Sequence, residues 1–174
     1  LGWGGGIERQ NLRFKNLIKN IKSNNSVLDV GCGFGDLYGY LKLKKWKGEY
    51  FGVDINEKLL KVAKQTHKEI KVSRSDIQKE NIKRYDWVIS SGIFNAKLYH
   101  ESNEIYIKEM LYKMFEISKR GIAVDFMTTY VDFQRDGAFH TDPNYIIKLL
   151  KKKTWKIEVN MNYLKYEFCV IAEK

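Results

Sequence analysis

The chain has 174 residues, of which 44% are hydrophobic and 30% charged, and no apolar run approaches the ~18 residues of a membrane helix. This composition is typical of a soluble globular domain and excludes a disordered or membrane-spanning chain. The formal net charge of +10 admits a nucleic-acid partner, but lysine dominates it and is scattered, which favours an ordinary solvated surface.

The cysteine content and the start of the chain bear on metal binding and on the cellular location. Cys32 and Cys169 lie far apart, without the spacing of a zinc site or a disulfide framework, so we expect no metal. No secretory signal is visible, and we expect a cytoplasmic location and no membrane partner. The chain begins at Leu1, which leaves the native start open, and the oligomeric state is open too.

The expected elements alternate along the first half of the chain. Apolar residues at helical spacing predict an amphipathic helix over 7–22. Asn56 is a suitable N-cap for a further helix that runs to His67. The remaining expectations here are strands at 26–30, 49–53 and 70–72, and a helix over 36–44.

The second half continues the alternation until its end. Asp142-Pro143 is a good helix start, an N-cap followed by proline at the first helical position. The last two expected strands, 155–160 and 165–172, have no helix between them and must be antiparallel. The other elements are strands at 85–90 and 121–127 and a helix over 102–118. Alternating strands and helices predict an α/β fold, here one domain over 1–174 with 1–22 as an N-terminal helix and lid.

The most informative segment is residues 26–36, in which an apolar run meets Gly31, Gly33 and Gly35 just before a helix. A strand that enters a helix through a glycine turn presents bare backbone N–H groups to a ligand. A dinucleotide fingerprint would need glycine at Asp36, and a P-loop would need a lysine that this segment lacks. The pattern is instead D-x-G-x-G-x-G, followed by an acidic residue, Asp54, after the next apolar run.

This pattern resembles that of class I S-adenosylmethionine (SAM)-dependent methyltransferases, in particular the small, single-domain type that acts on small molecules. The resemblance implies a Rossmann-like, seven-stranded, mostly parallel sheet with one antiparallel edge strand and helices on both faces. It also implies SAM as cofactor and S-adenosylhomocysteine (SAH) as product. The chain is then an enzyme, a methyltransferase.

The resemblance also implies a set of cofactor-binding residues at the strand ends. The backbone of the glycine loop should follow the methionine part of SAM, and a carboxylate after the second strand should accept the ribose hydroxyls. A short motif after the third strand should hold the adenine, and the backbone after the fourth should border the sulfonium. The residues are Gly31, Cys32 and Gly33, then Asp54 and Ile55, then Asp76 and Ile77, then Ser90 and Gly92, with Arg13 near the methionine carboxylate.

Fewer sequence features indicate which residues bind the methyl acceptor. The strand-four loop lacks the Asn-Pro-Pro-Tyr signature of amino-methylating enzymes, and no Pro-Cys pair exists for attack on cytosine, which favours small molecules. Two long aromatic loops, 94–102 and 128–141, and an acidic residue within an apolar strand mark the site. The predicted catalytic residues are His100, Asp125 and His140, and the predicted substrate-binding residues are Phe94, Asn95, Tyr99 and Tyr130.

The sequence therefore favours transfer of a methyl group from SAM to an oxygen or nitrogen of a small molecule, such as a sugar or a secondary metabolite. A methyltransferase of RNA or protein stays open, as does a SAM-binding domain without catalysis. Asp36, at the position where the fingerprint needs glycine, disfavours a nucleotide-dependent oxidoreductase.

Overall fold

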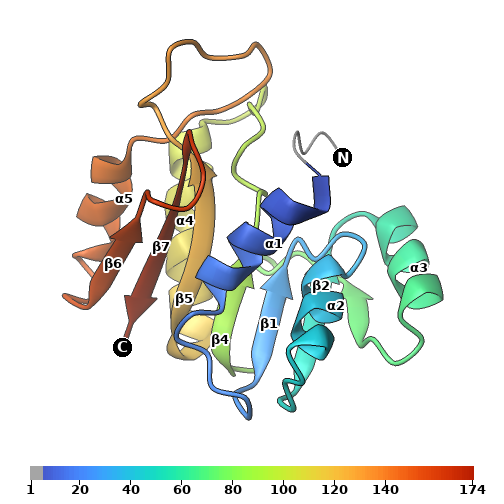
Figure 1. Cartoon of the computed structure of the whole chain (residues 1–174). Helices are drawn as coiled ribbons and strands as arrows, with labels where there is room; N and C mark the ends of the chain where they lie inside the picture. Colours follow the sequence, from blue (N-terminus) through green and yellow to red (C-terminus); the bar gives the residue numbers. More distant parts are fainter. Residues whose placement is uncertain (1–5) are drawn as a thin grey trace.

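Seven strands form one sheet in the order β3-β2-β1-β4-β5-β7-β6, and helices pack on both faces (Figure 1). The computed structural model describes residues 6–174. The strands are β1 Val27–Val30, β2 Tyr50–Asp54, β3 Val72–Arg74, β4 Tyr85–Ser90, β5 Ser118–Met127, β6 Ile157–Asn160 and β7 Glu167–Glu173. The helices are α1 Gly6–Leu17, α2 Asp36–Leu43, α3 Glu57–Thr66, α4 Asn103–Ile117 and α5 Pro143–Leu150.

The predicted sheet is confirmed. Strands β3, β2, β1, β4 and β5 run parallel to one another. Strand β7 runs antiparallel to both β5 and β6, so the reversed strand lies one place in from the edge and β6 forms the edge. The chain passes from β1 outward to β2 and β3, then returns to place β4 on the other side of β1. The carboxyl ends of β1 and β4 therefore flank a switch point, where open α/β sheets bind ligands.

The two faces of the sheet have separate apolar cores. One core joins the sheet to α4 and α5, through residues such as Ile107 and Ile146. The other joins it to α1, α2 and α3, through Phe14, Leu37 and Ala63. Strand β1 is buried along its whole length, as expected of a central parallel strand covered on both sides.

Local capping chemistry explains where several helices begin. The Asn56 side chain accepts a hydrogen bond from the Lys58 amide at 3.0 Å, and Asp142 accepts one from the Asn144 amide at 2.8 Å. Both predicted N-caps are confirmed, and Pro143 occupies the first turn of α5.

Element boundaries differ from expectation in a few places. The first helix ends at Leu17 rather than 22, and turns follow it. The third strand lies two residues later than predicted, at Val72–Arg74. Helix α4 passes directly into β5 at Ser118, so the strand begins three residues early. None of the helices in residues 6–174 is long and apolar enough to cross a membrane.

Candidate cofactor and active site

A cavity of about 690 Å³ lies at the carboxyl ends of β1, β2 and β4. Its wall includes nine of the ten predicted cofactor-binding residues and adds residues of α1, α2 and α4. The volume is within the usual range of small-molecule and cofactor sites. The nine are Gly31, Cys32, Gly33, Asp54, Ile55, Asp76, Ile77, Gly92 and Arg13.

The glycine loop owes its shape to residues that lack a side chain. Gly31 has φ +73°, and a Cβ there would stand 2.2 Å from the Cγ2 of Ile93. Gly33 has φ +54°, but a Cβ there would meet nothing within 4 Å, because the residue faces open space. Gly31 is thus required by packing, whereas Gly33 leaves room beside the loop for a ligand.

Asp54 ties the end of β2 to this loop. Its Oδ2 accepts a hydrogen bond from the Gly33 amide at 2.9 Å, and its Oδ1 accepts one from the Asn56 amide at 2.8 Å. Each carboxylate oxygen has more than one lone-pair site, so Asp54 can accept further hydrogen bonds from a ligand. A vicinal diol such as that of ribose suits this arrangement.

The segment after β3 also contributes to the cavity wall. Asp76 accepts a hydrogen bond from the Gln78 amide at 3.0 Å and forms an ion pair with Lys79 at 3.1 Å. Ile77, which is only 1% exposed, and Ile55, which is 71% exposed, both line the cavity. Two apolar side chains beside a carboxylate can hold a flat heterocycle with an exocyclic amino group.

Asp29 is a wall residue that the sequence reasoning missed. It stands within β1 and is 3% exposed, and the Tyr50 hydroxyl donates to its Oδ2 at 2.7 Å. Burial raises the pKa of Asp29 to about 7; the Tyr50 hydrogen bond opposes this rise. An acidic residue inside an otherwise apolar strand was the signal that could have found it.

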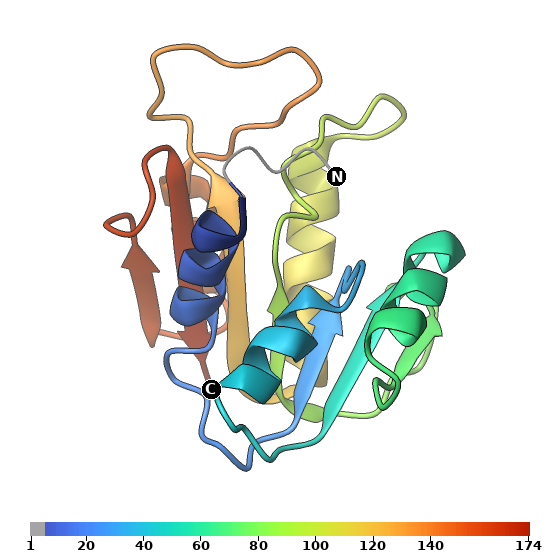
Figure 2. The same cartoon turned by 45° about the vertical axis from the view of Figure 1, so that its right-hand side comes forward.

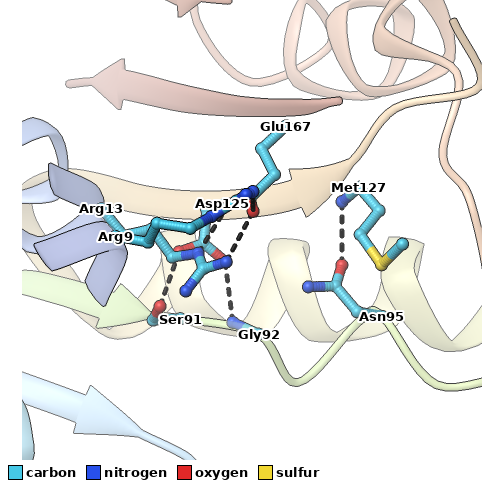
Figure 3. Close-up of polar contacts among 8 residues, drawn as sticks. All are labelled: Arg9, Arg13, Ser91, Gly92, Asn95, Asp125, Met127 and Glu167. Carbon is cyan, nitrogen blue, oxygen red and sulfur yellow. Dashed lines mark hydrogen bonds and ion pairs between the residues drawn. The ribbon is translucent and has the colours of Figure 1, made fainter. Parts of the chain in front are cut away.

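A buried charge cluster adjoins the cavity at the end of β5 (Figure 3). The Arg13 guanidinium donates to both carboxylate oxygens of Glu167, with distances of 2.6 and 2.5 Å. Arg9 adds a third contact to Glu167 at 3.2 Å. Arg13 lines the cavity as predicted, but Glu167 holds its guanidinium. No local sequence pattern indicates this pair, because its members lie 154 residues apart.

Asp125 belongs to the same region and is almost fully buried. Its carboxylate accepts a hydrogen bond from the Ser91 hydroxyl at 2.6 Å and another from the Gly92 amide at 2.8 Å. Burial raises the pKa of Asp125 to about 6, against the effect of the Ser91 hydrogen bond. Asp125 does not line the cavity, but Ser91 and Gly92 do. The predicted acid thus lies behind the wall and reaches the cavity through Ser91.

Several other predicted residues lie away from the cavity wall. Ser90 is fully buried, and its hydroxyl donates to the Val30 carbonyl at 2.7 Å. Phe94 belongs to the core, where it stacks on Phe126. His100 and Tyr99 are exposed on the loop after β4.

His140 and Tyr130 occupy the loop after β5. His140 is buried, with Nδ1 2.9 Å from the Thr128 carbonyl and no partner among the described residues for Nε2. Tyr130 is 59% exposed and accepts a hydrogen bond from Asn144 at 3.1 Å. Neither residue lines the cavity, so the structure leaves all the predicted His and Tyr residues outside it.

Asn95 joins the two long loops, which lie at the same end of the molecule (Figure 2). Its side-chain oxygen accepts from the Met127 amide at 2.9 Å, and its carbonyl accepts from the Phe139 amide at 3.0 Å. Lys97 donates to the Gly137 carbonyl at 2.9 Å. The predicted substrate residue Asn95 therefore fixes one loop against the other.

Comparison with known proteins identifies the class. A methyltransferase domain model matches residues 21–153. The protein "Putative methyltransferase Rv1506c" of Mycobacterium tuberculosis is 29% identical over 163 residues, which cover 90% of this chain and 98% of that one. "Putative methyltransferase 235L" of Invertebrate iridescent virus 6 is 35% identical over 112 residues, 59% of this chain and 42% of that one.

Solved structures share the fold. Magnesium protoporphyrin IX methyltransferase from Synechocystis, with bound SAH, has a TM-score of 0.74 at 18% identity, covering 96% of this chain and 83% of that one. A SAM-dependent methyltransferase from Archaeoglobus fulgidus has a TM-score of 0.73 at 18% identity, covering 96% and 94%. The chain belongs to the methyltransferase domain family, as a class I SAM-dependent methyltransferase.

The cavity fits the cofactor of this class. The glycine loop leaves open space where a Cβ of Gly33 would project. Asp54 offers carboxylate oxygens for a diol, and Asp76 with Ile77 offers an acceptor and an apolar surface for a heterocycle. These groups supply the hydrogen-bond acceptors and the apolar surface that the ribose and the adenine of SAM require.

Proposed function

We propose that this chain transfers the methyl group of SAM to an oxygen or nitrogen atom of a small molecule, such as a sugar or a secondary metabolite. The observation that carries the proposal is the cavity at the ends of β1, β2 and β4, in which Asp54 is hydrogen-bonded to the glycine loop. We further propose that residues 1–174 act as one domain in a reducing cytoplasm, which agrees with two free cysteines. The proposed lid includes residues 1–5, which lie outside the described residues.

Charge at the cavity wall supports a small acceptor over a nucleic acid. Among the described wall residues the cations are Arg13 and Lys79, and each contacts a carboxylate, Glu167 or Asp76. A polyanion needs free Lys and Arg beside the reacting centre. These two paired cations offer a phosphate backbone little attraction.

The chain's own residues would bind, orient and exclude water. SAM, when bound, supplies an electrophilic methyl group. Asp54 would hold the ribose, the glycine-loop backbone the methionine part, and Asp76 the adenine, which fixes the methyl group near Ser91 and Gly92. Proximity and alignment of this kind provide a large share of the barrier reduction in such displacements.

Asp125 is the predicted catalytic residue that has a connection to the cavity. An acceptor hydroxyl beside Ser91 can pass its proton to the Ser91 oxygen while Ser91 passes its own proton to Asp125. A carboxyl group with a pKa of about 6 suits a general base near neutral pH. His100 and His140 would need loop movement to reach an acceptor. We therefore rank both below Asp125 as the general base.

Calorimetry and a transfer assay test the proposal. The purified chain should bind SAM and SAH, and with SAM it should produce SAH when supplied with an acceptor from a panel of sugars, phenols and amines. A matched panel of tRNA and protein extracts tests the alternative acceptors. No heat and no thermal shift with either SAM or SAH would overturn the assignment.

A further inference from the structure

The wall of the cavity is acidic although the protein as a whole is basic. Against a formal net charge of +10, the described wall residues include five carboxyl groups. They are Asp29, Asp36, Asp54, Asp76 and Glu101.

Little of this negative charge is neutralised locally. Asp76 pairs with Lys79, and Arg13 is held by Glu167. Within residues 6–174, no ion pair to Asp29, Asp36, Asp54 or Glu101 occurs within 4.0 Å. Asp36 accepts a hydrogen bond from Gln10 at 2.9 Å, and Asp54 accepts hydrogen bonds from two backbone amides, so neither carboxyl group contacts a cation among these partners.

Asp29 is likewise surrounded by acidic groups. Its neighbours are the Tyr50 hydroxyl on β2 and the carboxyl groups of Asp54, Asp36 and Asp125 from β2, α2 and β5. Burial has the largest effect and raises the pKa of Asp29, and the Tyr50 hydrogen bond lowers it. The three carboxylates have smaller effects, which also raise this pKa. A cation placed in the cavity would therefore be attracted by several carboxylates through a low-dielectric wall.

We propose that this acidic wall selects its ligand by charge, binding the sulfonium cofactor more tightly than the neutral thioether product. The inference rests on the proposed function. SAM carries one more positive charge than SAH, and the two are otherwise alike apart from the methyl group. The wall thus binds SAM tightly before methyl transfer and binds SAH more weakly afterwards.

Titration calorimetry at pH 8 with SAM, SAH and sinefungin tests this inference. Sinefungin carries an amine cation in place of the sulfonium and separates charge from the methyl group itself. We expect SAM and sinefungin to bind about three- to tenfold more tightly than SAH at low salt. The preference should shrink toward unity at ~0.5 M salt, because screening acts on the charge-dependent part.

Two variants and a control locate the effect. Asp36→Asn removes a charge from an exposed site at the start of α2 and retains a hydrogen-bond acceptor for Gln10, so it should fold normally. Asp29→Asn removes the buried carboxyl, and its folding is checked by thermal unfolding. Each should weaken SAM and sinefungin several-fold and leave SAH within twofold. Asp136→Asn, on the exposed loop after β5, should change none of the three affinities.

The outcomes separate the two proposals. If SAH binds as tightly as SAM and sinefungin, or if both wall variants leave the preference intact, the charge selection is wrong while cofactor binding stands. If none of the three ligands binds, the proposed function itself is wrong.

Discussion

The part of the cavity proposed for the cofactor (the cofactor half) and the neighbouring region proposed for the acceptor are built in different ways. The cofactor half uses backbone and single side chains from β1, β2 and β3, all within residues 29–79. The proposed acceptor region uses a charge cluster that joins α1, β4, β5 and β7 beside the cavity, and it adjoins two long loops tied through Asn95. The first is a local construction and the second depends on contacts between distant parts of the chain. Local constructions are the ones that a short motif can encode.

The strongest test of this comparison breaks the Arg13–Glu167 pair. Arg13→Met should lower the free energy of unfolding by about 3–5 kcal/mol, because it leaves the Glu167 charge buried with less compensation. Urea denaturation measures the loss. The double variant Arg13→Met/Glu167→Leu should recover most of it, and equal losses in the single and double variants would contradict the pairing.

A glycine pair tests the cofactor half. Gly31→Ala should lower the free energy of unfolding by about 3 kcal/mol, since it adds a clash with Ile93 to the strain of positive φ. Gly33→Ala should cost about 1 kcal/mol, because its Cβ meets open space. Thermal unfolding ranks the two. An equal loss at both positions would show that packing against Ile93 plays no part.

Asp54 tests ligand recognition in the same half. Asp54→Ala should weaken SAM binding by about 1–3 kcal/mol through lost charge-assisted hydrogen bonds. Calorimetry measures the change, with Asp136→Ala as the control. An unchanged affinity would remove Asp54 from the ribose site.

The last test concerns the pH dependence of stability. The pKa values of Asp29 and Asp125 rise from 3.8 to about 7 and about 6, so the folded state binds their protons more tightly than the unfolded state does. These two groups therefore stabilise the fold less as pH rises from about 4 to about 7.

Thermal unfolding of the wild type and of Asp29→Asn between pH 5 and 8 measures this effect. The wild type should lose stability relative to the variant as pH rises, at about 2–4 °C for each kcal/mol in a domain of this size. Parallel curves for the two proteins would mean that Asp29 titrates normally.

The sequence predicted most of the fold, because periodicity and capping are local signals. The Asn56 and Asp142 caps, the antiparallel final strand and the glycine loop were all readable from neighbouring residues. The junction at Ser118, where a helix becomes a strand without a loop, carried no such signal, and the third strand was placed too early.

The candidate site was predictable to the same extent. Nine of the ten residues predicted to bind the cofactor lie on the cavity wall, and for all of these except Arg13 a strand end and its following loop determine the position. The acceptor side was harder, because burial and partners decide it. The residues around Glu167 did not indicate that it would bind Arg13. The residue types of Phe94 and His140 did not show that these side chains would be buried.

The Arg13–Glu167 contact has a consequence for how the protein is made. Arg13 of α1 is synthesised before its partner Glu167 at the start of β7, which lies 154 residues later in the chain. At usual rates of synthesis this is a delay of roughly 10–30 s, during which Arg13 has no native counterion. The apolar contacts of α1 with α2 can form earlier, but the Arg13–Glu167 pair is completed only after β7 is synthesised, so a product that stops before β7 would lack it.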